Sequence, residues 1–436
     1  MTTNSQRVID GLESWFSGFG IYRHPRVLAM LFLGFSAGLP FALVAGTLAA
    51  WLTRSGVGMT EVGMFAWVGI LYAFKFVWAP LVDQLKIPVL TRALGRRRSW
   101  MLLGQVGVAL ALAGMAGLDP VRQVSALAWL AVAVAFFSAT QDIAVDAWRI
   151  EAVDINLQAA MAASYQLGYR IALLFASAGA LFIAGNWSWP VAYQIMALLM
   201  GVGMITVMLV SEPLASTNQS GPGQLSLLHE PAKWITEAVV HPIAEFFSRN
   251  GTNALMILLF IGIYRISDMV LGVMANPFYL LTGFSELQIA AYAKTVGFGA
   301  VIAGAALGGV AVSRSGLGGP LVFGAVILAV TNLSFAGLAL VGANVPVLVL
   351  TICADNLAQG FTGTVFIAYL SSLTNVSYTA TQYALFTSLM VLPGKLLSGL
   401  SGAVVDAVGW LSFFSYAALM GVPAIALAVW VSRRLD

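Results

Sequence analysis

Twelve long apolar segments dominate this sequence and limit what it can fold into. They cover roughly residues 27–53, 62–82, 99–118, 124–148, 159–184, 189–210, 253–281, 288–312, 319–341, 345–371, 380–406 and 410–431. Each is close to the length of about 20 mostly apolar residues that a helix needs to cross a bilayer. Only 9% of the 436 residues are charged, whereas soluble domains are about one quarter charged. The sequence therefore predicts an all-α membrane protein with twelve transmembrane helices in a lipid bilayer.

The positions of Lys and Arg predict how these helices are oriented. Loops on the cytoplasmic side of a membrane carry an excess of basic residues. If the N-terminus is cytoplasmic, the outer side holds only Arg54 and Arg122. The inner side then holds Arg7, Arg23, Arg26, Lys86, Arg92, Arg96, Arg97, Arg98, Arg149, Lys233, Arg249, Arg314, Arg433 and Arg434. We therefore expect both termini in the cytoplasm.

The longest connection, residues 211–252, divides the spans into two groups of six. We expect a cytoplasmic N-terminal segment (1–26), a six-helix half (27–210), a cytoplasmic linker (211–252) and a second six-helix half (253–436). Within the linker, Trp234, Ile235, Ala238 and Val239 recur at helical spacing, which favours interfacial helices on the inner leaflet.

The two halves also resemble each other in sequence. The stretch RIALLFASAGALFIAGNWSWPVAYQ (170–194) matches KLLSGLSGAVVDAVGWLSFFSYAA (395–418) in its cation, its run of small residues and its aromatic residues. Weak internal repeats of this kind are typical of transporters whose substrate site lies at the interface of two halves. They predict pseudo-symmetric halves.

Ionisable residues within the spans mark the expected transport pathway. Such groups are costly in lipid, so they face protein or water and are usually functional. Those well inside the spans are Lys75, Asp142, Asp146, Arg170, Arg265, Asp268, Lys294, Asp355 and Lys395. Spans 3, 6, 9 and 12 contain none, so we expect these four to be peripheral.

Asp142 and Asp146 are the candidates for proton coupling. They lie four residues apart and therefore on one face of a helix. Two carboxylates in a poorly solvated cavity repel each other, so the pair can take up a proton near neutral pH. His24, His229 and His241 lie outside the apolar segments, which excludes a histidine relay inside the membrane. The alternative is a structural ion pair with Arg149 or Lys75.

Basic residues slightly outnumber acidic ones inside the spans, which favours an anionic or zwitterionic substrate. We expect Arg170 and Lys395, at equivalent positions in the two halves, to face each other across the cavity. Arg265 and Asp268 are placed to neutralise each other, and Asp355, alone on its span, to bind hydroxyl groups. Tyr165, Tyr169 and Tyr264 could stack on sugar rings of the substrate, while ordinary packing is the alternative explanation for them. The predicted substrate-binding residues are Lys75, Gln141, Tyr165, Tyr169, Arg170, Tyr264, Arg265, Asp268, Lys294, Asp355, Gln359 and Lys395.

Four motifs together resemble the muropeptide permease (AmpG-type) family of the major facilitator superfamily. They are GFSAGLPFAL, KFVWAPLVD, GRRRSW and ATQDIAVDAWRIE, and the resemblance extends over both halves. It implies the twelve-helix major facilitator fold. It also implies a proton-coupled symporter in a bacterial inner membrane, which imports 1,6-anhydro-muropeptides (GlcNAc-anhydroMurNAc and its peptides) into the cytoplasm. Such transport serves peptidoglycan recycling and, in some bacteria, resistance to β-lactams.

The resemblance also identifies candidate gating residues. The superfamily has a Gly-x-x-x-Asp-Arg-x-Gly-Arg-Arg signature between spans 2 and 3, which Asp83 and Gly95-Arg96-Arg97 match in type. Here Gln84 replaces the first Arg and KIPVLTRAL lengthens the spacing. Asp83 can meet the start of a neighbouring helix or an Arg of the loop. We predict gating by Asp83, Arg96, Arg97, Arg149 and Glu151, while simple cytoplasmic anchoring is the alternative for the Arg cluster.

Two other functions compete with this interpretation. Acetyl-CoA transporters and other organic-anion facilitators of the same superfamily share parts of the pattern. An integral membrane enzyme would need a nucleophile, base or metal cluster near one interface, and none is found in the sequence. We therefore predict no catalytic residues, metal, cofactor or nucleic-acid partner. A nucleotide-binding motif is absent, which excludes ATP-driven transport. We expect a monomer.

Overall fold

The computed structural model describes residues 18–57, 65–213, 230, 233, 236–289, 292, 295–398 and 400–435, and over these ranges the regular structure is helical. The N-terminal bundle contains α2 (Pro25–Val44), α3 (Gly46–Arg54), α5 (Ile70–Ala73), α6 (Ala79–Gln84), α7 (Leu90–Leu94), α8 (Arg96–Ala116), α9 (Val124–Ala152), α10 (Ile155–Leu174), α11 (Ala180–Asn186), α12 (Trp189–Leu199) and α13 (Gly201–Leu209). The C-terminal bundle contains α18 (Ala254–Ile263), α19 (Ile266–Thr282), α20 (Glu286–Ile289), α21 (Gly297–Ser315), α22 (Gly318–Val341), α23 (Val345–Ser372), α24 (Thr379–Ser398), α25 (Ser401–Leu419) and α26 (Gly421–Leu435).

Among the described residues, ten helical stretches are long and apolar enough to cross a membrane. They correspond to ten of the twelve expected spans. The other two differ from that expectation. Residues 65–84 form short pieces, namely η2 (Phe65–Gly69), α5, η3 (Lys75–Val77) and α6, while α24 is less apolar and carries Gln382 and Lys395. These two segments pack on each other between the bundles, and a segment that faces protein need not be as apolar as one that faces lipid.

Close helix packing in each bundle depends on glycine. A Cβ atom on Gly34 of α2 would collide with the Tyr165 carbonyl oxygen of α10, and one on Gly168 would collide with that of Leu31. In the C-terminal bundle, Gly304 of α21 and Gly360 of α23 allow the same close approach. Small residues let membrane helices pack backbone against backbone, where the hydrophobic effect does not drive association.

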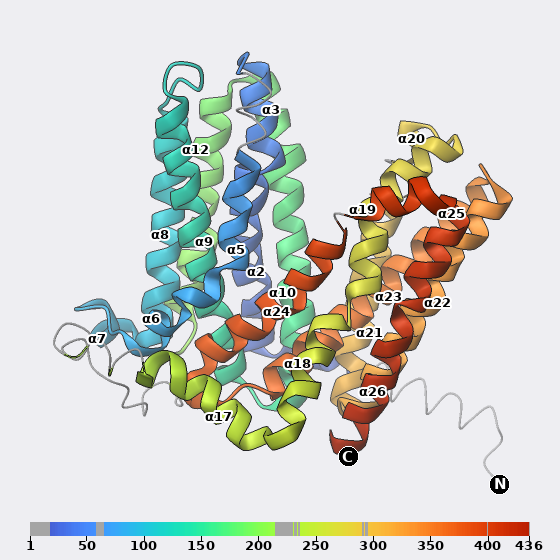
Figure 1. Ribbon diagram of the computed structural model, residues 1–436. Helices are drawn as coiled ribbons and strands as arrows, with labels where there is room; N and C mark the ends of the chain where they lie inside the picture. Colours follow the sequence, from blue (N-terminus) through green and yellow to red (C-terminus); the bar gives the residue numbers. More distant parts are fainter. Residues whose placement is uncertain are drawn as a thin grey trace, which may run out of the picture.

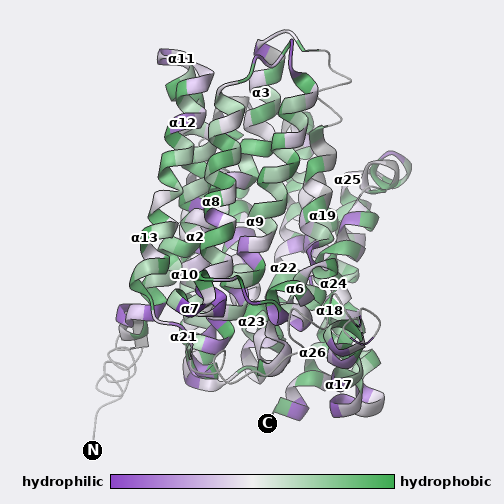
Figure 2. Ribbon diagram, turned by 90° about the vertical axis from the view of Figure 1, so that its left-hand side faces the viewer, coloured by the Kyte–Doolittle hydropathy of each residue, from purple (hydrophilic) through white to green (hydrophobic). Residues whose placement is uncertain are grey.

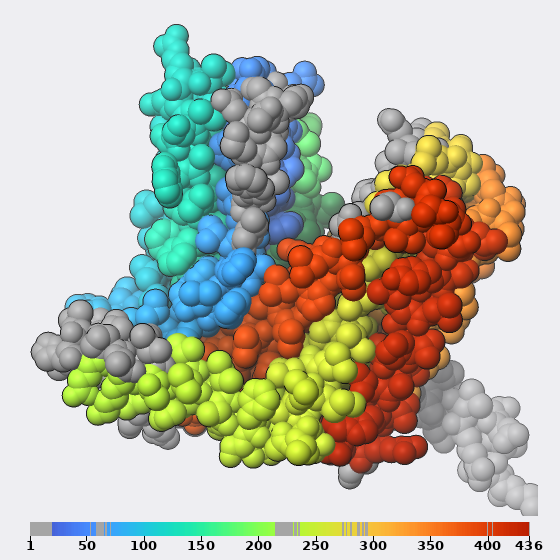
Figure 3. Space-filling model, in the orientation of Figure 1, coloured from blue at the N-terminus to red at the C-terminus, as the bar shows by residue number. Residues whose placement is uncertain are grey.

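The two bundles meet at one end of the molecule and part toward the other (Figures 1 and 3). They meet where α10 packs on α21 and α23, and where α24 packs on α6 and α9. The meeting end carries α7, α17 (His241–Asn250) and the basic C-terminal turn with Arg433 and Arg434, and is called here the basic end. Hydrophilic residues gather near this end, while the helices beyond it are mostly hydrophobic (Figure 2).

The described part of the linker lies across the basic end. It comprises the π-helix η5 (Thr236–Val240) and α17, which pack near α6 and α24 respectively. Trp234 and Ile235, on which the expected interfacial helix partly rested, lie outside the described residues.

Candidate functional site

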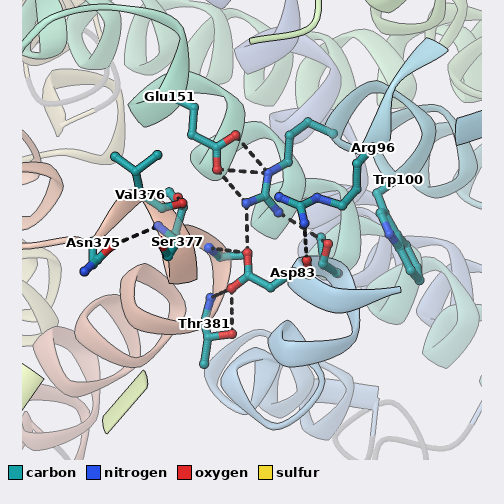
Figure 4. Close-up of polar contacts among 12 residues, drawn as sticks. Asp83, Arg96, Trp100, Glu151, Asn375, Val376, Ser377 and Thr381 are labelled. Carbon is teal, nitrogen blue, oxygen red and sulfur yellow. Dashed lines mark hydrogen bonds and ion pairs between the residues drawn. The ribbon is translucent and has the colours of Figure 1, made fainter. Parts of the chain in front are cut away.

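Asp83 connects the two bundles at the basic end. Its carboxylate is buried on α6 and forms an ion pair with Arg97 of α8, Oδ1 to Nη2, at 2.8 Å. It also accepts hydrogen bonds from the backbone N–H of Ala380 (3.0 Å) and Thr381 (2.6 Å) and from the Thr381 hydroxyl (2.7 Å; Figure 4). The first N–H groups of a helix have no partner inside it and attract negative charge. Asp83 therefore contacts both kinds of partner that the sequence left open: the start of another helix, α24, and an Arg of the GRRRSW motif, which lies in the first turn of α8.

Arg97 completes this contact and is itself fully buried. Its Nη2 lies 2.5 Å from Oε1 of Glu151 at the end of α9, and its Nε lies 3.1 Å from the same oxygen. Arg96 donates to the Asp83 carbonyl oxygen at 2.5 Å. A buried charge without a partner costs several kcal/mol, so Asp83, Arg97 and Glu151 depend on one another. We call these three residues the gate triad.

Arg149 forms a second connection between the bundles. Its Nη1 donates to the Ser371 hydroxyl of α23 at 3.0 Å, and its guanidinium lies 5.1 Å from the ring centroid of Tyr383 on α24. Within its own bundle it contacts Gln158 at 3.2 Å and Asp146 at 3.7 Å. The gating residues predicted from the sequence thus all lie at the basic end, and their gating role stays a prediction.

The C-terminal side of this contact contains residues that the sequence reasoning missed. Gln382 donates from Nε2 to Glu245 of α17 at 2.7 Å and accepts from the Asn375 backbone N–H at 2.7 Å. Glu245 also accepts from Asn375 Nδ2 at 2.9 Å and pairs with Arg249 one turn later. The Glu245–Arg249 spacing in the linker was the available signal, since i, i+4 charge pairs indicate a helix. The contacts of Gln382 with Glu245 and Asn375 carried no such signal.

Asp142 and Asp146 lie above this contact on α9 but have different surroundings. Asp146 lies between Lys75 (3.5 Å) and Arg149 (3.7 Å), as the structural alternative anticipated. Asp142 interacts with the Lys75 and Asp146 charges and with Tyr165. Its Oδ1 atom is buried with no hydrogen-bond partner among the described residues. The two carboxylates are therefore together, but Asp142 is the less neutralised of the two.

A small cavity lies between the bundles where α10 faces α21 and α23. Its volume is about 60 Å³, which exceeds the roughly 10–15 Å³ that a polar cavity needs in order to hold one water. Arg170 from the N-terminal bundle and Arg265 from the C-terminal bundle both line it. The remaining polar lining residues are Gln166, Gln359 and Thr364. We call this the two-arginine cavity.

Two carboxylates lie behind Arg265. Its Nη2 pairs with Asp268 Oδ2 at 2.5 Å, so the expected i, i+3 pair is present. Asp355 is buried on α23 and accepts from Gln359 Nε2 at 2.7 Å. Asp355 is alone on its own span, but it lies within electrostatic range of Asp268 and Arg265 because α19 and α23 bring them to one place.

Three predicted substrate contacts lie away from the two-arginine cavity. Tyr264 is buried, stacks on Phe366 at 4.2 Å and donates to the Leu321 carbonyl, so it is not available to a sugar. Gln141 is buried between α2 and α9, where it accepts from Ser36. Lys395 does not face Arg170. It lines a separate cavity of about 740 Å³ between α24 and α2, α3 and α5.

Two other predicted contacts, Tyr165 and Tyr169, are partly exposed on α10, and their ring centroids are 6.1 Å apart. Tyr169 directly precedes Arg170, and Tyr165 lies about one turn earlier. Lys294 lies outside the described residues.

Two helical bundles that meet at one end and part at the other are typical of secondary transporters. Residues 30–397 match the Major Facilitator Superfamily, so the chain belongs to it. The chain is 33% identical to the anhydromuropeptide permease of Escherichia coli K12 over 418 residues, covering 95% of this chain and 82% of that one. It is 31% identical to the putative transporter AmpG 4 of Rickettsia felis, covering 95% and 99% of the two chains. Within the superfamily it thus belongs to the AmpG-type family, and it is a transporter and not an enzyme.

Solved structures show the same fold. The Escherichia coli fucose:proton symporter FucP matches with a TM-score of 0.67 at 14% identity, covering 97% of this chain and 99% of that one. The proton:xylose symporter XylE matches with a TM-score of 0.65 at 13% identity, covering 94% and 95%. These matches confirm the predicted major facilitator architecture.

Proposed function

We propose that this chain imports 1,6-anhydro-muropeptides from the periplasm across a bacterial inner membrane, driven by the proton gradient, for peptidoglycan recycling. The two-arginine cavity is the observation that carries this proposal. Arg170 and Arg265 come from different bundles and line one small space. Guanidinium groups bind carboxylates through two parallel hydrogen bonds, and muropeptides carry peptide carboxylates. The 33% identity to a protein named anhydromuropeptide permease supports the same substrate.

The remaining space between the bundles suits the body of such a substrate. The cavity lined by Lys395 measures about 740 Å³, within the range of about 300–1,000 Å³ for small-molecule sites. The excess of basic residues at the basic end supports the proposal that this end of the molecule faces the cytoplasm. On this proposal the structure is closed to the cytoplasm by the gate triad and open to the periplasm.

Proton coupling is proposed for Asp142 and Asp146. Asp142 has a buried oxygen, Oδ1, that has no hydrogen-bond partner among the described residues. Asp146 contacts Arg149, which in turn contacts Ser371 and Tyr383 of the other bundle. A change of charge at this pair would therefore change a contact that joins the bundles. We propose that the chain works as a monomer.

Uptake into proteoliposomes tests the substrate. Purified protein should accumulate labelled GlcNAc-anhydroMurNAc peptide when the outside is acidic, and a protonophore should abolish the accumulation. Unlabelled peptide should compete well, the peptide-free disaccharide less well, and acetyl-CoA poorly. Strong competition by acetyl-CoA without uptake of the peptide would favour the organic-anion alternative, which the two arginines also suit.

A further inference from the structure

We propose that a carboxylate of the substrate competes with Asp268 for Arg265, and that Asp268 and Asp355 take up a proton when Arg265 is drawn away. This rests on the proposed function, because it requires an anionic substrate in the two-arginine cavity. It adds a proton site in the C-terminal bundle that responds directly to the substrate.

Arg265 is placed to serve both partners. It lies in the turn between α18 and α19, pairs with Asp268, and lines the two-arginine cavity with Arg170. Its Nε atom is buried with no hydrogen-bond partner among the described residues. A guanidinium carries five N–H donors in a fixed fork. A substrate carboxylate between Arg170 and Arg265 would satisfy the remaining donors and weaken the pair with Asp268.

Gln359 links the same cavity to Asp355. Gln359 lines the cavity and donates to Asp355 Oδ2 at 2.7 Å. The other carboxylate oxygen, Oδ1, is buried with no partner in the described part of the chain. A substrate group that draws the Gln359 amide toward the cavity would withdraw the one donor that Asp355 has among the described residues. The cavity thus touches both carboxylates through a single intermediate side chain each.

The charges around the two carboxylates explain why a proton would bind. Asp268 and Asp355 share Arg265 as their nearby cation, and Tyr279 of α19 faces Asp355. Arg170 of α10 lines the same cavity, and Lys294 lies outside the described residues. Without Arg265, two poorly solvated carboxylates repel each other, which favours protonation of one. By linkage, substrate binding promotes proton binding and proton binding promotes substrate binding to the same degree.

This site differs in role from Asp142 and Asp146. In the N-terminal pair Asp146 contacts Arg149 at the basic end, and the C-terminal pair contacts Arg265 and Gln359, which line the two-arginine cavity. The first is therefore connected with the gate and the second with the substrate. The C-terminal pair would make the protein bind the peptide more tightly as the pH falls, because the protonated pair releases Arg265.

The test is the pH dependence of binding to purified protein. We would measure the Kd of labelled GlcNAc-anhydroMurNAc peptide from pH 5 to 8 for wild type, Asp268→Asn, Asp355→Asn and, as control, Asp406→Asn, an exposed carboxylate of α25. Wild type and the control should bind more tightly at low pH, by up to about tenfold per pH unit for one linked proton. Asp268→Asn should bind at pH 8 as tightly as wild type does at low pH, with the slope lost, and Asp355→Asn should lose most of the slope.

A second measurement needs no variant. Addition of the peptide to weakly buffered wild-type protein should remove about one proton per bound substrate from solution, which a pH-sensitive dye reports. An unchanged slope in Asp268→Asn, or no proton uptake by wild type, would overturn this inference and leave the proposed substrate intact. Failure of wild type to bind the peptide at any pH would instead overturn the proposed function.

Discussion

The carboxylate of Asp83 binds the start of α24 across the bundle interface, where the Thr381 backbone N–H lies 2.6 Å and its hydroxyl 2.7 Å from Oδ2. The other oxygen of the same carboxylate contacts Arg97. One side chain thus joins α24 to a buried charge cluster of the N-terminal bundle. Opening the basic end must separate Asp83 from Thr381, while Arg97 can stay paired with Glu151. The contact can therefore break without leaving Arg97 uncompensated.

Replacement of Asp83 by Asn should change the rate of transport more than the affinity for substrate. The amide cannot pair with Arg97 and accepts more weakly from the start of α24, so the state closed at the basic end loses stability. A side chain that differs between two states shifts their populations. We expect a change of about tenfold or more in the uptake rate, equivalent to about 1.4 kcal/mol, with Kd within about twofold. Initial uptake rates and equilibrium binding in proteoliposomes would measure both.

The matched control for this change is Asp154→Asn. Asp154 is an exposed carboxylate at the same end of the molecule, just before α10. It should behave as wild type. A loss of affinity in Asp83→Asn at an unchanged rate would place Asp83 in the substrate site and contradict a gating role.

The orientation in the membrane can be tested with single cysteines. Cys353 is the one cysteine of the sequence, so Cys353→Ala gives a cysteine-free background. Arg92 is exposed near the start of α8 and Arg122 is exposed between α8 and α9. We expect a membrane-impermeant maleimide to label Arg122→Cys in intact cells but to miss Arg92→Cys, because positive loops are cytoplasmic. Position 97 is unsuitable because Arg97 is buried. Labelling of Arg92→Cys from outside would invert the topology.

The sequence predicts the spans well where a helix faces lipid and less well where it faces protein. Apolar length locates the helix from Val345 to Ser372 to within one residue of the expected range. The same criterion does not describe residues 65–84, whose short helical pieces pack against α24. The internal repeat predicts that Arg170 faces Lys395, whereas the structure brings Arg170 and Arg265 to one cavity. Arg265 lies in a turn between two helices, and sequence spacing carries no information about which bundle face that turn meets.

Replacement of Arg170 and of Lys395 should differ in how strongly the effect on uptake depends on the charge of the substrate. Arg170→Gln removes one of the two guanidinium groups of the cavity. It should weaken uptake of GlcNAc-anhydroMurNAc peptides about 10- to 100-fold, since hydrogen bonds to charged groups contribute about 1.5–3 kcal/mol. The peptide-free disaccharide, with fewer carboxylates, should lose less. Lys395→Gln is the matched change of a pathway cation outside that cavity. Its effect on the two substrates should be similar. Equal loss of both substrates in Arg170→Gln would indicate a structural role for Arg170.

The last prediction concerns Asp142 and Asp146, and their different surroundings sharpen it. Asn at either position should abolish uphill accumulation of substrate, because neither amide can bind and release a proton. Counterflow exchange needs no net proton movement and should survive in Asp142→Asn, whose Oδ1 has no partner to lose among the described residues. Asp146→Asn leaves Lys75 and Arg149 without a carboxylate between them, so it should also lower exchange and thermal stability. Uptake with and without an imposed proton gradient, together with counterflow, separates these effects. Uphill accumulation by both variants at the wild-type level would show that the pair is structural, and coupling would then rest on Asp268 and Asp355.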